Sequence, residues 1–208
     1  MSSEEDRPPK AQEIRPPKAQ EDRLLSTEEA APRSTREEAS PGTRERDALL
    51  AEAIGLRERG SREEARDRLL VLSARHPDDP EIAYQTAWAH DVLGLEAEAV
   101  PYYEKALAAG AEGLGAEERR GVFLGLGSTY RILGRHEAAV ATLRRGTEEY
   151  PEDGSLRAFL AMALYNTGRH HDSTRILLRL LAQTSTDPFV REYREAIEYY
   201  AEDLDRVE

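Results

Sequence analysis

The sequence predicts an all-α protein, a solenoid of helical hairpins that stack on one another. Two sets of regularly spaced residues and the amino-acid composition support this prediction. Ala, Glu, Leu and Arg dominate and β-branched residues are sparse, so an extensive sheet is not expected. Glycines suited to turns are spaced 34, 40 and 34 residues apart, at Gly60, Gly94, Gly134 and Gly168. A small residue follows each of them by five positions, at Ala65, Ala99, Ala139 and Ser173.

Each set has a physical reason. Glycine ends a helix well because it adopts the left-handed backbone of a helix terminus. The small residue lets two helices cross closely. Because one hairpin of about 34 residues cannot bury its apolar face alone, successive hairpins are expected to stack. The interval of 40 corresponds to one repeat plus six inserted residues, which we assign to the glycine-rich loop at 110–115.

Residues 1–45 are expected to form a disordered tail. They are rich in Pro, Glu, Arg, Ser and Thr, and they contain the segment RPPKAQE twice. A docking or spacer role and a solvated linker without a partner both remain open for this tail. A domain of helical hairpins, 46–205, follows it.

The four hairpin units are expected at about 46–79, 80–113, 120–153 and 154–187, with a last helix at 188–204. Apolar residues at helical spacing predict both helices of each unit. In the first unit they are Leu49, Leu50, Ala53, Ile54 and Leu56, then Ala65, Leu69 and Leu72. In the second they are Ala83, Ala87 and Leu93, then Ala99, Tyr103, Ala106 and Leu107. In the third they are Leu126 and Tyr130, then Ala139 and Leu143, before Pro151. In the fourth they are Phe159, Leu160, Ala161 and Leu164, then Ser173, Leu177 and either Leu180 or Leu181.

The last helix is expected to cap the solenoid. A solenoid exposes apolar surface at its final repeat, so a terminal helix with one wet face is predicted there. The residues expected on its packing side are Phe189, Tyr193, Ala196, Ile197, Tyr200 and Leu204.

Charge and composition argue against several classes of function. The net charge of −12 and the pI of about 5.0 disfavour binding to nucleic acid or to an anionic membrane. No apolar run approaches the ~18 residues of a membrane span. Cysteine is absent, which removes thiolate metal sites and cysteine nucleophiles. We therefore expect a cytoplasmic protein.

No group of residues suggests catalysis, a cofactor or a metal. His170, His171 and Asp172 are adjacent, but adjacent side chains on a helix point apart and do not converge on one ion. The carboxylates follow solvated helix faces, and no pair is singled out for acid–base chemistry. The sequence thus predicts a protein that is not an enzyme.

Residues 46–205 resemble the tetratricopeptide repeat family. The residues that carry the resemblance are Leu126, Gly127, Tyr130, Gly134, Ala139, Leu143 and Pro151 in the third unit and Ala87, Gly94, Ala99, Tyr103 and Ala106 in the second. The run from Leu124 to Leu204 looks like the bacterial subgroup called tetratrico peptide repeat group 5. This resemblance implies a right-handed α-solenoid and an interaction module, with a homodimer as one option. The first unit departs from the pattern at Glu52, Ala53 and Leu56.

The resemblance also implies a binding surface, because the first helices of such units line a concave groove. The corresponding residues are Tyr84, Trp88 and Asp91 in the second unit, Leu124, Ser128 and Arg131 in the third, and Ala158, Met162, Tyr165 and Asn166 in the fourth. Aromatic anchors with one arginine and one amide would suit a peptide. The alternative is that Tyr84, Trp88 and Met162 simply pack between neighbouring helices.

The sequence therefore predicts a non-enzymatic module that binds a protein or peptide partner in its groove. A clamp for a C-terminal carboxylate is not supported, because only Arg131 and Asn166 stand at its positions. The alternative function is a self-associating, dimeric scaffold. In that alternative an exposed apolar end pairs with a second copy, and the less regular first unit is the expected end.

Overall fold

The structure is a computed structural model that describes residues 40–110 and 113–207. Within these ranges the regular structure is entirely helical. Its helices, in chain order, are α1 (Pro41–Glu58), α2 (Arg62–Arg75), α3 (Pro80–Asp91), α4 (Glu96–Ala108), α5 (Ala116–Ile132), α6 (His136–Glu149), α7 (Gly154–Asn166), α8 (His170–Thr184), α9 (Pro188–Glu192) and α10 (Arg194–Glu202). The predicted all-α class is confirmed. Most of the tail expected at 1–45 lies outside the described residues.

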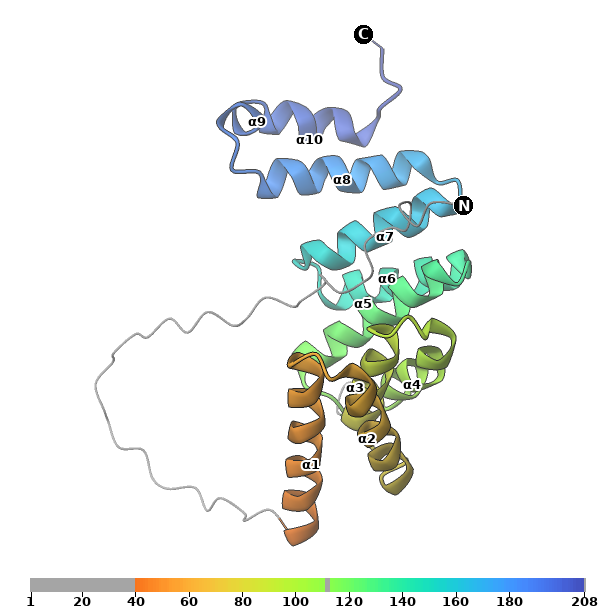
Figure 1. Cartoon of the computed structure of the whole chain (residues 1–208). Helices are drawn as coiled ribbons and strands as arrows, with labels where there is room; N and C mark the ends of the chain where they lie inside the picture. Colours follow the sequence, from red (N-terminus) through yellow and green to blue (C-terminus); the bar gives the residue numbers. More distant parts are fainter. Residues whose placement is uncertain (1–39, 111–112, 208) are drawn as a thin grey trace, which may run out of the picture.

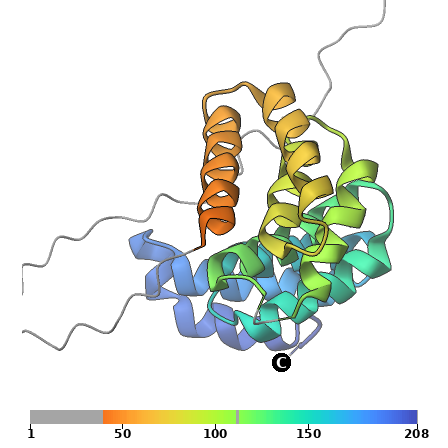
Figure 2. The same ribbon diagram turned by 90° about the horizontal axis from the view of Figure 1, so that it is seen from below.

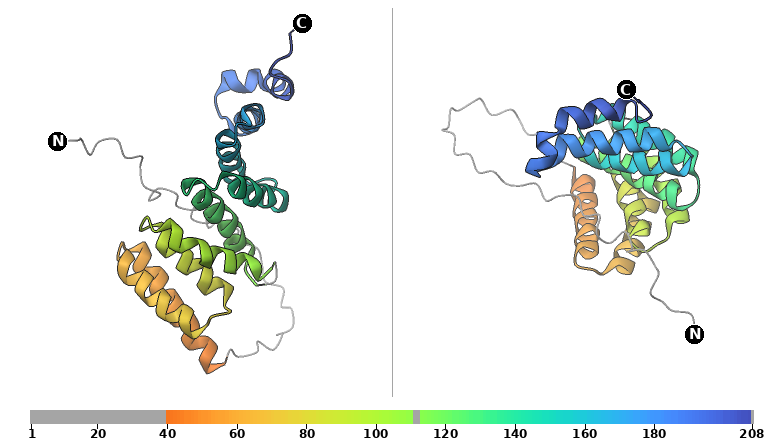
Figure 3. Two further views of the ribbon diagram at one scale, coloured as in Figure 1. Left: turned by 90° about the vertical axis from the view of Figure 1, so that its right-hand side faces the viewer. Right: turned by 90° about the horizontal axis from the view of Figure 1, so that it is seen from above.

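The helices stack as an α-solenoid, as predicted. Four hairpins, α1–α2, α3–α4, α5–α6 and α7–α8, follow one another, and each packs on the next (Figure 1). The helix axes turn along the stack: α1 stands upright at one end, whereas α8 and α10 lie across the other (Figure 1). Seen from below, the α1–α2 hairpin lies in front of the rest of the stack (Figure 2). A side view shows the hairpins stepping from α1–α2 to the C-terminal helices (Figure 3).

The turn glycines have the backbone that their spacing suggested. Gly60, Gly94, Gly134 and Gly168 have φ angles of 92°, 72°, 72° and 77°. Side chains are strained in this left-handed region, although a Cβ at any of the four would meet open space. The glycines are therefore required by conformation and not by crowding.

The small residues five positions later lie at helix crossings. Ala65, Ala99 and Ala139 are completely buried. Ser173 is buried too, and its Oγ donates a hydrogen bond to the carbonyl oxygen of Ala161 at 2.7 Å. This bond lets a polar residue occupy a position that elsewhere holds alanine, because a buried hydroxyl is costly only when it has no partner.

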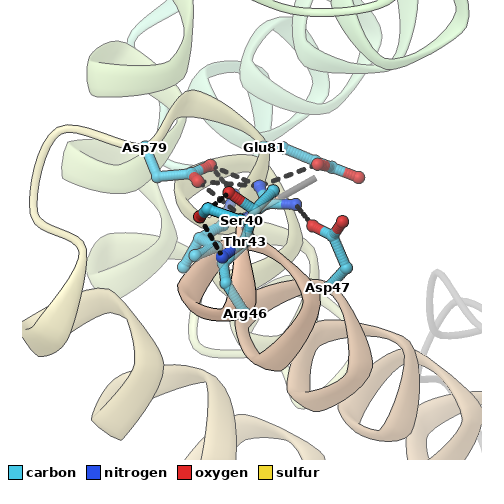
Figure 4. Close-up of polar contacts among 7 residues, drawn as sticks. Ser40, Thr43, Arg46, Asp47, Asp79 and Glu81 are labelled. Carbon is cyan, nitrogen blue, oxygen red and sulfur yellow. Dashed lines mark hydrogen bonds and ion pairs between the residues drawn. The ribbon is translucent and has the colours of Figure 1, made fainter. Parts of the chain in front are cut away.

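An arginine joins the first two units (Figure 4). In the cluster of Figure 4, Arg46 of α1 donates from Nε to Asp79 Oδ2 at 2.9 Å and from Nη2 to Asp79 Oδ1 at 2.8 Å. Glu81 and Asp47 also pair with it, at 2.8 and 2.9 Å. Asp79 caps α3 by accepting the Ile82 N–H at 3.0 Å. Burial alone would raise the pKa of Asp79, but the hydrogen bonds from Arg46 and Ile82 outweigh it and lower that pKa.

An equivalent clamp, an arginine paired with a helix-capping aspartate, joins the third and fourth units. Arg120 donates to Asp153 at 2.7 Å, and Asp153 caps α7 by accepting the Leu156 N–H at 2.9 Å. In both clamps the arginine precedes its aspartate by 33 positions. At the second junction Gly115 caps α5 and Pro80 stands at the arginine position. The junction that carries the insertion thus lacks this clamp.

The first helix begins earlier than expected. The sequence analysis placed residues up to 45 in the tail, but α1 starts at Pro41. Ser40 accepts a hydrogen bond from the Thr43 N–H at 3.2 Å, and a proline with fixed φ suits the first helical position.

The six-residue insertion is not confined to the loop at 110–115, where it was expected. The third unit's first helix, α5, begins at Ala116, 18 positions before its turn glycine, Gly134. The first helix of the second unit, α3, begins at Pro80, only 14 positions before Gly94. Part of the insertion therefore lengthens α5.

A helical segment follows the four units as predicted, but it differs from the expected capping helix. It breaks at Tyr193 into α9 and α10, and α10 packs against α8. The expectation that its apolar residues would be buried is wrong: Phe189 is 74% exposed, and Tyr193, Tyr200 and Leu204 are exposed as well. Of the described residues in this segment, only Ala201 is buried.

Replacing Gly127 by alanine should destabilise the protein. Gly127 of α5 faces Leu143 of α6 so closely that an added Cβ would overlap the fully buried leucine side chain. We expect the free energy of unfolding to fall by about 1–3 kcal/mol, because overpacking outweighs the gain in helix propensity. Urea denaturation followed by circular dichroism measures this. Gly42→Ala is the matched control, since its nearest neighbour would lie 3.9 Å away; equal losses in both variants would contradict the packing argument.

Replacing Arg46 by methionine should loosen the first unit. The change leaves the partly buried Asp79 carboxylate without its cation, so we expect a loss of about 1–3 kcal/mol. Hydrogen exchange of amides in α1 and α2 should accelerate more than that in α6. Arg68→Met removes an exposed arginine with two carboxylate partners and should change little. Unchanged exchange in the Arg46 variant would refute the clamp.

Candidate functional site

The surface assigned to binding lies on α3, α5 and α7, which are neighbours in the stack. The structure divides the predicted residues into two groups. Those on α3 take part in internal packing and hydrogen bonds. Those on α7 are exposed except for Ala158, and those on α5 are intermediate.

Tyr84 is buried at the junction of the second and third units. Its ring stacks on that of Trp88 with centroids 5.8 Å apart and lies 6.4 Å from that of Tyr103. Gly121 of α5 provides the room, since a Cβ there would overlap the Tyr84 hydroxyl. Burial raises the pKa of Tyr84 to about 12. The structure thus places Tyr84 in the packing arrangement that the sequence analysis held open as the alternative.

Trp88 is half-buried beneath an arginine from the preceding unit. The Arg57 guanidinium lies 3.7 Å from the ring centroid of Trp88, a cation–π contact. Arg57 also donates from Nη1 to Gln85 Oε1 at 2.7 Å, and among the described residues it has no carboxylate within ion-pair distance. Burial lowers the pKa of Arg57. A ligand would have to displace this buried cation to reach that face of Trp88.

Asp91 connects three helices from inside the stack. Its Oδ2 accepts a hydrogen bond from the Tyr103 hydroxyl of α4 at 2.8 Å. Its Oδ1 accepts another from the Thr129 hydroxyl of α5 at 2.9 Å. Burial raises the pKa of Asp91 to about 6 in spite of these two bonds. The carboxylate is therefore engaged by the protein's own hydroxyls.

On α5 the predicted residues are partly open. Ser128 donates from Oγ to the carbonyl oxygen of Gly125 at 2.9 Å, so its hydroxyl is turned back on its own helix. Arg131 has a buried Nε without a hydrogen-bond partner in the described part of the chain. Leu124 is half-buried. The next residue after Arg131, Ile132, is 55% exposed.

On α7 the predicted residues are the most accessible. Met162 is 42% exposed and Tyr165 is 62% exposed, and Asn166 follows them at the end of the helix. The Tyr165 ring lies 4.8 Å from that of His170, the first residue of α8. Ala158, one turn earlier, is half-buried.

Sequence reasoning missed Arg57 and Ile132. Both could have been found from the repeat. Arg57 stands 34 positions before Asp91, and Ile132 stands 34 positions before Asn166. Each therefore shares a register position with a residue that was predicted. The first unit departs from the repeat pattern, which obscures the register position of Arg57 in the sequence.

The structure offers little for metal or small-molecule chemistry. Within residues 40–110 and 113–207, no three His, Cys, Asp or Glu side chains converge as a metal site would require. His171 instead lies 3.7 Å from Asp205, and Asp172 pairs with Arg169. A shallow pocket beside these residues has a volume of about 100 Å³, below the ~300 Å³ of typical ligand pockets.

No helix in the described part of the chain has both the length and the apolarity needed to cross a bilayer.

Comparisons with known proteins agree with this geometry. The family model described as "Tetratrico peptide repeat" matches residues 80–204, which is more than half of the chain. A solved structure of MamA from residue 41 to its end, from Desulfovibrio magneticus RS-1, is similar with a TM-score of 0.60 and 17% identity. It covers 76% of this chain and 86% of that chain. The "ArsTM double mutant" of MamA RS-1 has a TM-score of 0.59 at 17% identity and covers 76% and 85% of the two chains. No curated protein matches the chain.

The Asp91→Asn variant should have a different dependence of stability on pH. The folded-state pKa of about 6 exceeds the ordinary value of 3.8, so the contribution of Asp91 is complete only well below pH 3.8 and is lost as pH rises through 6. The stability of the wild type relative to the variant should therefore fall by about 2 kcal/mol between pH 4 and pH 7. Urea denaturation at several pH values measures this. A constant difference would show that the carboxylate is not buried as described.

Proposed function

The chain belongs to the tetratricopeptide repeat family, and from this premise we propose that it is a non-enzymatic module that binds a protein or peptide segment. The proposed site is the exposed part of the first-helix surface on α5 and α7. We define this α5–α7 surface as Arg131, Ile132, Met162, Tyr165 and Asn166. The proposal also places the protein in the cytoplasm, as the sequence analysis expects.

One observation carries the proposal. The N-terminal half of the first-helix surface, on α3, is already in contact with other side chains of the protein, whereas the C-terminal half, on α5 and α7, is more open. In the N-terminal half Arg57 covers Trp88, and the protein's own hydroxyls satisfy Asp91. In the C-terminal half Met162 and Tyr165 expose apolar area that no segment among residues 40–110 and 113–207 covers. Binding energy is gained where apolar area is still in contact with water, so the α5–α7 surface is the half that can gain it.

The chemistry of this surface suits a short segment with both apolar and acidic side chains. Tyr165 and Met162 provide an aromatic anchor and an adaptable thioether contact. Arg131 supplies a guanidinium that has no ion-pair partner in the described part of the chain and could pair with a carboxylate of the ligand. Asn166 offers an amide donor and acceptor for a peptide backbone.

The site is tested by comparing partners captured by variant proteins. Full-length protein should capture partners from a native lysate that Tyr165→Ala/Arg131→Ala loses, with the affinity for each purified partner falling by about 10-fold or more. Tyr165 is exposed, and Arg131 is half-buried without an ion pair in the described part of the chain, so the melting temperature should change by only a few degrees.

Val71→Ala is the matched control for this test. Val71 of α2 is an equally exposed aliphatic residue that lies away from α5 and α7 in the stack. It should retain every partner. Two outcomes would show that the α5–α7 surface is not the binding site. In the first, the double variant still captures the partners and the Val71 variant does not. In the second, Trp88→Ala alone loses the partners while its fold is intact.

A further inference from the structure

One register position shows where the stack is incomplete. Leu69, Tyr103, Leu143 and Leu177 occupy equivalent positions on the second helices, since they are spaced 34, 40 and 34 residues apart. The first three are 0%, 2% and 0% exposed, whereas Leu177 is 44% exposed. Leu181, one turn later on α8, is 45% exposed. In the earlier units the next first helix packs on the second helix that carries this position.

The terminal helix packs on a different face of α8. Glu202 of α10 pairs with Arg179 of α8, and Ala182, three residues after Arg179, is buried, although its equivalent in α6, Glu148, is exposed to solvent. Conversely, Thr174 of α8 is exposed, although its equivalent in α6, Val140, is buried. The face on which a further repeat would stack therefore remains uncovered. Figure 1 shows α10 running along α8 at the end of the stack.

The exposed side of α10 extends this uncovered face. Tyr193 is the N-cap of α10, where its carbonyl oxygen accepts a hydrogen bond from the Ile197 N–H at 2.9 Å, and Tyr200 lies two turns later, so both lie near one side of this helix. The Arg179–Glu202 ion pair lies along the other edge of the α8–α10 pair. In an antiparallel pair, helical geometry then puts both tyrosines on the same side as Leu177 and Leu181. Phe189, one turn before Tyr193, continues this side, and we call the result the C-terminal patch, made of Leu177, Leu181, Phe189, Tyr193 and Tyr200.

The patch is large for a monomeric protein. Phe189, Tyr193 and Tyr200 are 74%, 60% and 50% exposed. At about 200 Å² for each aromatic residue, these three alone present roughly 350 Å² of surface to water. Leu177 and Leu181 add to this area, which reaches the range of about 300–600 Å² in which the largest apolar patch of a monomer is often functional. A polar rim would bring it toward the ~800 Å² per partner of a standard interface.

We propose that the C-terminal patch binds the same patch of a second copy of this chain, in a two-fold symmetric dimer. The other end of the solenoid offers no comparable surface: of the described residues before 80, Val71 is the one exposed large hydrophobic side chain. A head-to-tail stack would place the patch against a charged end, whereas a tail-to-tail dimer matches apolar area with apolar area.

The charges at the rim are self-complementary. Arg191 and Glu192, both exposed, stand between Phe189 and Tyr193 in the chain and therefore lie next to the patch. When a two-fold axis sets two such segments antiparallel, cations of one copy can face carboxylates of the other. The first unit, which the sequence analysis expected to be the associating end, is not the end that carries the exposed apolar area. The proposed dimer does not depend on the α5–α7 surface.

Light scattering and sedimentation equilibrium of the full chain, between about 1 and 100 µM, test this proposal. The wild type should approach twice the chain mass of 23.3 kDa. Leu177→Glu/Leu181→Glu should raise the dimer dissociation constant by about 100-fold or more, because it places charge in the apolar contact. Circular dichroism should report unchanged helicity, since both leucines are nearly half exposed.

Val71→Glu is the matched control, because it puts the same charge on an equally exposed aliphatic residue at the other end; it should remain dimeric. Phe189→Ser/Tyr193→Ser provides a second disruption at side chains that are mostly exposed, and it should also give monomers. A wild type that is monomeric at about 100 µM would overturn the proposal. So would a dimer that survives both disruptions, or one that Val71→Glu dissociates.

Discussion

The structure depends on one packing constraint: the second helix of each hairpin has a face that only the next hairpin's first helix can cover. Leu69 and Leu143 show the covered state, and Leu177 shows the uncovered one. Burying a leucine is worth about 1.5–3 kcal/mol, so each completed junction stabilises both hairpins that form it. The stability of the solenoid therefore depends on the contacts between neighbouring hairpins. The same constraint leaves an apolar surface where the series stops.

The second junction shows how one large side chain changes its surroundings. Tyr103 stands where the three other units have leucine. Its ring fits because Gly125 has no Cβ to overlap it, and its buried hydroxyl requires an acceptor, which is Asp91. Thr129 supplies a second donor to that carboxylate. A residue that repeat register assigns to ligand binding is thereby used to hold three helices together, and this half of the first-helix surface is closed.

Repetition also explains how far the candidate site could be predicted. Arg57, Asp91, Arg131 and Tyr165 share one register position. Spacing identified three of them, but it could not distinguish their roles, because the role depends on what the adjacent helix presents. Arg57 makes a cation–π contact with Trp88, and Asp91 accepts hydrogen bonds from two hydroxyls. Tyr165 is mainly exposed to solvent.

The sequence by itself determined the helical hairpins, their turns and their common register. These features follow from local physics: glycine allows a left-handed turn, and apolar residues at helical spacing define one buried face. Only the tertiary structure decided which predicted residues remain accessible, how the insertion is divided between loop and α5, and where α10 lies. Those outcomes depend on competition between neighbours for the same buried area. A helix break at Tyr193 leaves no periodic signal, and the face of α8 that α10 covers is chosen by packing between segments.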